Sequence, residues 1–215
     1  METITICGGG SLGHVVAGWL AAKRKAVVNI LTNHPDKWQN ELSVYAPDDE
    51  VLVGRIAKIS SNAQDVIPKA DVVLLCLPGF LIAEELMKIK PFLKKEIFVG
   101  SVFSSTGFFF EAKKILDANQ PLWGFQRVPF ISRVDIYGKS ARLLGYKDAH
   151  NIAVENVSAE LVHVFTRKLS DWFERPIKLL KNYFEASLTN SNPLIHTSRL
   201  YTMFGGKNEN MKYEF

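Results

Sequence analysis

The sequence predicts an α/β protein built on a mostly parallel, doubly wound sheet, and three observations support this class. An apolar strand pattern at residues 4–7 breaks into glycines and resumes as a helical pattern. A second strand pattern follows at residues 26–32, and a continuous apolar run leads into Pro78 and Gly79 at residues 71–79. An apolar run without polar alternation is typical of a parallel strand that helices cover on both faces.

The motif Gly8-x-Gly10-x-x-Gly13 joins the first strand to the first helix. Gly8 permits a sharp exit from the strand, Gly10 lets the backbone approach a pyrophosphate, and Gly13 lets the helix pack closely on the strand. The pyrophosphate would lie on the helix N-terminus, where unpaired N–H groups favour anions. Because the motif follows a strand and opens a helix, it indicates a Rossmann-like dinucleotide site rather than a ligand-free turn. We assign Gly8, Gly10, Ser11, Leu12 and Gly13 to cofactor binding.

The end of the second strand bears on the choice of cofactor. In NAD-specific versions of this fold, an acidic residue about 20 residues beyond the glycines accepts the ribose 2′-OH. Here the strand ends at Thr32 without a carboxylate, and Thr32, Asn33 and Lys37 can donate to a 2′-phosphate. The sequence therefore favours NADP, and NAD remains the alternative because Asp36 lies in the same loop.

Strand and helix patterns continue to alternate through the middle of the chain. The expected elements are short strands at 51–53 and 56–59 within a turn-rich region (38–60), a strand at 71–79 beside the first strand, a helix ending near residue 89, a strand at 97–102, a loop at 104–107 and a helix at about 109–118. Open α/β sheets bind ligands at the carboxyl ends of their strands. Leu77, Pro78 and Ser104 are therefore expected to line the nicotinamide side of the site.

Shorter strands follow residue 123. Residues 134–137 and 141–145, joined by Gly138-Lys139, predict a hairpin, and a helix at about 159–173 precedes a short strand at 176–180. Asn192 is expected to cap a last helix, with Pro193 at its first position, that runs to about residue 204. The polar tail at 207–215 has no core-forming pattern.

Composition narrows the class of protein. The chain has 215 residues, 47% of them hydrophobic and 22% charged, which is ordinary for a globular enzyme. A net charge of +4 suits an anionic ligand but gives no reason to expect nucleic acid. We expect no signal peptide and no membrane span. The two cysteines, Cys7 and Cys76, fall in strands without a CxxC pair, which favours reduced thiols in a cytoplasmic protein, and the histidines lack metal-ligand spacing.

Three stretches resemble the opine dehydrogenases of the octopine and nopaline type. They are the glycine opening, the Ser105-Thr106-Gly107-Phe108 loop leading into Pro129-x-x-x-Arg133 and Gly138-Lys139, and the helix start Asn192-Pro193-x-x-His196. The resemblance covers most of this chain but only the N-terminal part of such enzymes. It implies reduction by NAD(P)H of the imine that an α-keto acid forms with an amino acid.

The resemblance also implies roles for individual residues. His196 matches the catalytic histidine of the family, and its place one turn into a helix favours the neutral imidazole, which suits proton transfer near neutral pH. Arg133 is a candidate to hold a substrate carboxylate through a bidentate pair, with a surface arginine as the alternative. Gln126 replaces an acidic or polar residue often found before the proline in the family, so we include it in the substrate site.

The length of the chain leads to the remaining expectations. Such enzymes carry a further helical domain, so we divide the chain into a dinucleotide-binding domain (1–180) and a linker with the first helix of a truncated or missing helical domain (181–215). That helix would expose apolar side chains, so we expect a homo-oligomer. Two other functions stay open: a 2-keto acid reductase similar to ketopantoate reductase, and a cofactor-binding module without catalysis.

Overall fold

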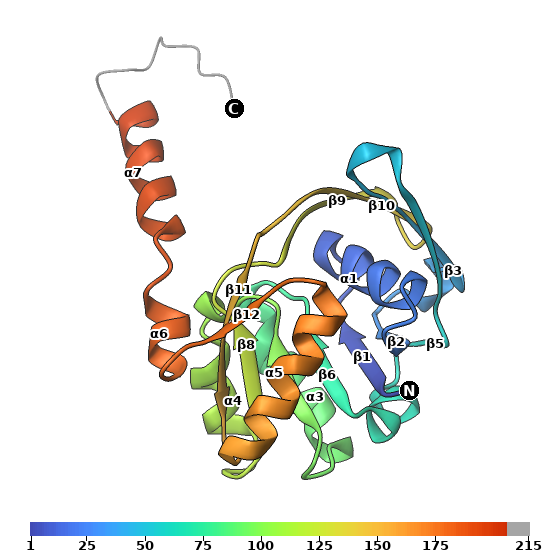
Figure 1. The fold of residues 1–215 in the computed structure, drawn as a ribbon, viewed down its shortest axis with the longest axis horizontal. Helices are drawn as coiled ribbons and strands as arrows, with labels where there is room; N and C mark the ends of the chain where they lie inside the picture. The colour runs from blue at the N-terminus through green and yellow to red at the C-terminus, as the bar shows by residue number, and fades with distance from the viewer. Residues whose placement is uncertain (206–215) are drawn as a thin grey trace.

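The computed structural model describes residues 1–205, apart from the side chains of Asp48, Thr106 and Pro193. Its centre is an eight-stranded sheet in the order β12-β11-β8-β7-β6-β1-β2-β5 (Figure 1). The strands are β1 (Thr3–Cys7), β2 (Val27–Leu31), β5 (Lys58–Ser60), β6 (Val72–Leu75), β7 (Phe98–Ser101), β8 (Leu122–Phe125), β11 (His150–Glu155) and β12 (Ile177–Leu179). Neighbours from β5 to β8 are parallel, whereas β11 runs antiparallel to β8. The predicted mostly parallel sheet, with β6 beside β1, is confirmed.

Helices cover both faces of this sheet. One face packs on α1 (Ser11–Ala22) and α5 (Ala159–Phe173) through a core that includes Trp19, Trp123 and Phe165. The other face packs on α2 (Ala63–Val66), α3 (Ile82–Ile89), α4 (Phe108–Ile115) and α6 (Tyr183–Leu188). Every residue of β6 is buried, which explains its uninterrupted apolar sequence. The fold is therefore doubly wound, as the sequence predicts.

A second sheet encloses α1 from the side opposite the main sheet. Its strand order is β4-β3-β10-β9, formed by β3 (Glu41–Tyr45), β4 (Val51–Arg55), β9 (Phe130–Ile136) and β10 (Ser140–Tyr146). Figure 1 shows these strands arching over α1. Residues 13–20 of α1 are all buried as a result. Two glycines permit the close approach: a Cβ on Gly18 would collide with Val44, and one on Gly54 would lie 2.7 Å from the Ala22 nitrogen.

The structure corrects several expected boundaries. The predicted hairpin is present as β9 and β10, but β10 also pairs with β3, which in turn pairs with β4 to make the second sheet. The region 38–60 contains β3, which the sequence pattern does not predict, and it supplies strands to both sheets. β11 and α6 are also additional elements, and the helix expected at 109–118 ends at Ile115. The two missed strands, β3 and β11, are short, and each pairs with a strand that is distant in the sequence.

The last described helix, α7 (Asn192–Phe204), extends away from the body of the molecule in Figure 1. Its predicted range is confirmed, but the expected cap is wrong: Asn192 is already helical, and Ser191 occupies the N-cap position without a capping hydrogen bond from its side chain. The Oδ1 atom of Asn190 accepts a hydrogen bond from the Asn192 N–H instead. The expected polar tail at 207–215 lies outside the described residues. Within residues 1–205, no helix is long and apolar enough to cross a membrane.

Candidate functional site

The glycine loop between β1 and α1 has the geometry that its sequence predicts. Gly8 has φ +114°, and a Cβ there would lie 2.6 Å from the Cys76 carbonyl oxygen. A Cβ on Gly13 would collide with the Gly8 carbonyl oxygen. Gly10 is different, because no atom lies within 4 Å of the position that its Cβ would occupy. Two of the glycines are therefore required by packing within the protein, whereas Gly10 leaves open space at the N-terminus of α1, where an anion would bind.

Two cavities flank this loop, and Leu77 lines both. The first, which we call the Thr32 cavity, has a volume of about 190 Å³. The second, which we call the Arg133 cavity, has a volume of about 450 Å³. Both lie at the carboxyl ends of parallel strands, where doubly wound sheets bind ligands. The arrangement provides one long, divided site on either side of the helix N-terminus.

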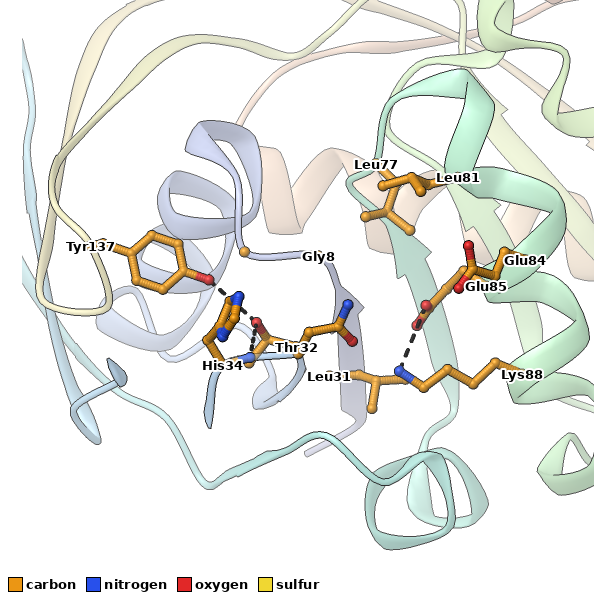
Figure 2. Close-up of a pocket in the computed structure, with 12 residues that line it drawn as sticks. Gly8, Leu31, Thr32, His34, Leu77, Leu81, Glu84, Glu85, Lys88 and Tyr137 are labelled. Carbon is orange, nitrogen blue, oxygen red and sulfur yellow. Dashed lines mark hydrogen bonds and ion pairs between the residues drawn. The ribbon is translucent and has the colours of Figure 1, made fainter. Parts of the chain in front are cut away.

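The Thr32 cavity lies at the end of β2 (Figure 2). Its lining includes Gly8, Thr32 and Asn33, three of the residues predicted to bind cofactor, but not Lys37, which is exposed on a 3₁₀ turn. Tyr137, from the turn between β9 and β10, lines the same cavity. Its hydroxyl lies 3.4 Å from the Thr32 Oγ1 atom. The turn residues of the hairpin thus reach the cofactor side, which the sequence pattern alone does not indicate.

The charged groups of this cavity come from α3. Glu84, Glu85 and Lys88 line its other end, and the Lys88 Nζ atom lies 3.8 Å from the Glu85 Oε2 atom. Burial raises the pKa of the Glu85 carboxyl, while the nearby Lys88 acts in the opposite direction. Burial also raises the pKa of the neighbouring Cys7 thiol, and both cysteines are free and buried. These thiols are therefore protonated at neutral pH, as expected for structural cysteines.

His14 joins the glycine loop to the second sheet. Its side chain is fully buried, and its ring stacks on Trp38 with centroids 4.1 Å apart. The Gly138 N–H donates to the His14 Nε2 atom at 2.8 Å, so the proton lies on Nδ1, which donates to the Gly10 carbonyl at 3.0 Å. Burial lowers the pKa of His14, consistent with this neutral form. His14 was not among the predicted site residues, although its position directly after Gly13 could have indicated that it lies at the glycine loop.

The Arg133 cavity lies on the other side of the loop. Six residues predicted to be in the site line it: Gly10, Ser11, Leu12, Leu77, Pro78 and Arg133. The Val134 N–H donates to the Ser11 hydroxyl at 3.1 Å, which fixes β9 against the first turn of α1. Arg133 is exposed and is the only charged residue in a lining that is otherwise mostly apolar. No side chain within residues 1–205 forms an ion pair with it. A guanidinium in this setting is available to an anionic ligand.

Besides Gly13 and Lys37, three more predicted site residues line neither cavity. Ser104 is fully buried, and its hydroxyl has no hydrogen-bond partner among the described residues. Gln126 uses both ends of its amide: it donates to the Thr189 hydroxyl at 2.6 Å and accepts from the Asn151 amide at 2.9 Å. His196 is exposed on α7 and lines neither cavity. In this structure, therefore, Arg133 lies beside the glycine loop and His196 does not.

No group of three His, Cys, Asp or Glu side chains that could hold a metal ion occurs within residues 1–205. The other buried histidine, His150, lies between the rings of Phe125 and Phe173 on the far part of the sheet. Its surroundings are aromatic and basic rather than acidic, and they lower its pKa to about 4 through burial and the charges of Arg175 and Lys147.

Comparison with known proteins relates this geometry to families. Residues 4–104 match the family described as ketopantoate reductase PanE/ApbA. The chain is 23% identical to octopine dehydrogenase from Mizuhopecten yessoensis over 94% of its length, covering 54% of that protein. It is 28% identical to tauropine dehydrogenase from Arabella iricolor over 73% of its length, covering 43% of that protein. An uncharacterised protein from Sinorhizobium fredii is 29% identical over 94% of the chain and 56% of its own length.

Solved structures show the same fold. Octopine dehydrogenase in complex with NADH and agmatine superposes with a TM-score of 0.86 at 22% identity, over all of this chain and 57% of that one. Yersinopine dehydrogenase with NADP⁺ bound superposes with a TM-score of 0.63 at 14% identity, over 87% of this chain and 49% of that one. The chain thus spans about half the length of the curated relatives it matches.

The sheet order and the glycine loop define the class of protein: the chain has the Rossmann-type dinucleotide-binding fold of dehydrogenases and reductases. Within that class it is similar to the opine dehydrogenases, in keeping with the resemblance in its sequence, and residues 4–104 match the PanE/ApbA family.

Proposed function

We propose that this chain is the cofactor-binding part of a nicotinamide-dependent dehydrogenase of the opine type. The observation that carries the proposal is the open space at Gly10, at the N-terminus of α1 and between the two cavities. Backbone N–H groups at a helix N-terminus bind a pyrophosphate there, with one nucleoside on each side. In this arrangement the adenosine occupies the Thr32 cavity and the nicotinamide occupies the Arg133 cavity.

For the cofactor we propose NADP, with NAD as the alternative. Support for NADP comes from Thr32 and Asn33, which follow β2 without a carboxylate and line the Thr32 cavity, so neutral donors would face the ribose. Lys37 is on the adjacent turn and exposed, where its flexible side chain is free to approach a 2′-phosphate. Thr32→Asp tests this choice, because it adds charge repulsion and a ribose acceptor and should shift the preference toward NAD. Wild-type protein that binds NAD tenfold tighter than NADP would contradict the proposal.

For the substrate we propose an α-keto acid condensed with an amino acid. Arg133 would hold a carboxylate at the mouth of the apolar cavity, next to the place where the nicotinamide supplies hydride to the imine carbon. The role assigned to Gln126 requires it to give up its bond to Thr189 or to Asn151, so contact with the substrate would be coupled to movement of the segment before α7. Both assignments rest on the resemblance together with this geometry.

The decisive assay is the oxidation of NADPH and of NADH with pyruvate, with and without a panel of amino acids. An opine-type reaction needs both substrates, because the imine forms from them. A 2-keto acid reductase, the alternative favoured by the PanE/ApbA match, consumes the keto acid alone. A module without catalysis binds the dinucleotide but gives no turnover in either condition. Each of the three functions therefore predicts a different pattern of rates.

His196 is the proposed acid–base group. Because it lies on α7 away from both cavities, its action requires α7 to approach the cleft, from this chain or from a second copy. In protein that turns over, His196→Ala should lower kcat by roughly 100-fold or more and leave dinucleotide affinity nearly unchanged. His163→Ala, an exchange on the remote helix α5, is the matched control and should change neither. Equal turnover by the His196 variant and wild type would remove His196 from the mechanism.

We also propose how the chain is organised. The proposed division at residues 180 and 181 leaves α6 with the C-terminal segment, although Ala186 of α6 is buried against the main body. The segment that stands apart is α7, which exposes Leu194, Leu200 and Tyr201. Such a face favours association, so we propose a homo-oligomer. The two free, buried thiols support a reducing, cytoplasmic location.

A further inference from the structure

Tyr137 connects the second sheet to the glycine loop. It comes from the turn after β9, more than 100 residues beyond the glycine loop, yet its hydroxyl covers Gly9 so closely that a Cβ on Gly9 would collide with it. The same hydroxyl lies 3.4 Å from Thr32 Oγ1 at the end of β2. Figure 2 shows the ring approaching Thr32 and His34 from the side opposite α3. Tyr137 therefore joins the two segments that surround the ribose in this fold.

The ring of Tyr137 is held in place by its neighbours. It packs edge-on against His14, with centroids 5.1 Å apart, and against Trp38, with centroids 5.8 Å apart. The next residue, Gly138, has φ +72° and donates its N–H to His14. A side chain at Gly138 would collide with the Lys37 carbonyl oxygen, so the turn is packed against the loop that follows β2. The hydroxyl is thus held in place by packing within the protein, without any contribution from a ligand.

Counting protons shows that this pair of hydroxyls has a donor to spare. Tyr137 and Thr32 carry one O–H proton each, and a single hydrogen bond between them uses one of the two. The His34 N–H lies 3.5 Å from the Thr32 oxygen as a further donor to it, so Thr32 already has an acceptor role within the protein. Whichever hydroxyl donates to the other, the remaining proton is free to point into the cavity that both residues line.

We propose that Tyr137 determines how this chain recognises the 2′ position of the adenosine ribose. The Tyr137–Thr32 pair donates a hydrogen bond to the 2′ oxygen, which belongs to a hydroxyl in NAD and to a phosphate in NADP. The proposal rests on the proposed function, because it requires adenosine to occupy the Thr32 cavity. It adds a residue from the second sheet to a site otherwise made by the glycine loop and β2. It also gives the β9–β10 hairpin a direct part in cofactor recognition.

The test is a cycle of two proteins and two ligands. Wild type and Tyr137→Phe are titrated with ADP and with 2′-deoxy-ADP by calorimetry. The Phe ring keeps the packing on His14 and Trp38 and removes only the hydroxyl. One hydrogen bond of about 1 kcal/mol corresponds to a roughly fivefold change in affinity. We expect Tyr137→Phe to weaken ADP binding by roughly three- to tenfold and to leave 2′-deoxy-ADP binding unchanged.

A third ligand and variants of Thr32 extend the test. With 2′,5′-ADP in place of ADP, a loss in the Phe variant larger than the ADP loss identifies the 2′-phosphate as the group recognised, and an equal or smaller loss identifies the 2′ hydroxyl. Thr32→Val should reproduce the loss, and the double variant should lose little more, because the two hydroxyls act as a pair. Thr32→Ser keeps the hydroxyl and should behave as wild type.

The outcomes separate this inference from the proposed function. If wild type binds none of these nucleotides, the proposed function and the inference both fail. If wild type binds ADP but Tyr137→Phe leaves its affinity unchanged, or weakens ADP and 2′-deoxy-ADP equally, Tyr137 only fills space and the inference is wrong while the proposed function stands. A melting temperature within about 2 °C of wild type confirms that the variant folds.

Discussion

His150 should make the folded protein sensitive to mild acid. It is 2% exposed, and its Nε2 atom has no hydrogen-bond partner among the described residues. Its pKa in the folded protein is about 4, against an ordinary value of 6.5. Between these values the unfolded chain binds a proton that the folded chain does not, so stability falls as the pH is lowered from about 6.5 toward 4. Linkage over that interval gives about 2 kcal/mol lost between pH 7 and pH 5, and about 3 kcal/mol in the limit of low pH.

Urea unfolding at pH 7 and pH 5, in wild type and in His150→Phe, measures this loss. Phenylalanine keeps a ring against Phe125 and Phe173 and cannot be protonated. Other titrating groups, including His14, are common to both proteins and cancel in the comparison. We expect the free energy of unfolding of wild type to fall by about 2 kcal/mol more than that of the variant. The reasoning would be refuted if the change in unfolding free energy between pH 7 and pH 5 were the same in both proteins to within about 0.5 kcal/mol, roughly the additivity error of such comparisons.

Three further predictions concern the glycine loop, the segment before α7 and α7 itself. Gly10→Ala should fold normally and lose dinucleotide affinity in calorimetry, whereas Gly13→Ala should lower the melting temperature, since only its Cβ meets the protein backbone; equal melting temperatures would contradict this. Gln126→Glu removes the donor to Thr189, whose own proton is given to a backbone carbonyl, so amide exchange at residues 189–192 should become faster. An unchanged rate would show that the bond from Gln126 to Thr189 does not hold this segment. Tyr201→Glu should shift the oligomer toward monomer in light scattering, and a wild type that is already monomeric would remove α7 as an interface.

The sequence allows the elements with a strong local pattern to be predicted. α5 is found over the predicted residues 159–173, because its apolar residues repeat at helical spacing and Ser158 caps it with a bond from the Leu161 N–H. β6 is recognised because burial on both faces requires an unbroken apolar run. The glycine loop is recognised because its glycines fall at fixed spacing between a strand and a helix. In all of these cases the pattern itself lies within a short run of residues, even where the contact that requires it is distant, as between Gly8 and Cys76.

The elements and site residues that the sequence does not predict depend on contacts between distant segments. β3 pairs in parallel with β10, so Ser43 lies opposite Ser140, and no local pattern encodes such a pairing. The five residues of β3 do alternate, with Leu42 and Val44 buried, but so short an alternation was the only local signal for this strand. The same holds for the site: Tyr137 contacts the glycine loop, and Gly138 donates to His14, only because the hairpin folds back across α1. Lys37 shows the converse, since proximity in sequence to β2 does not place it in the cavity.

The burial of α1 on every side has a consequence for how the chain is made. α1 is complete by residue 22, but the strands that cover it from the second sheet continue to residue 146. At 5–20 residues per second a ribosome needs on the order of ten seconds to synthesise that interval. During this time Trp19 lacks the partners that β9 and β10 supply, among them Phe130 and Tyr146. The helix at the centre of the candidate site is therefore synthesised before the other described helices but is not enclosed until β10 has been made, and until then its apolar face is open to association.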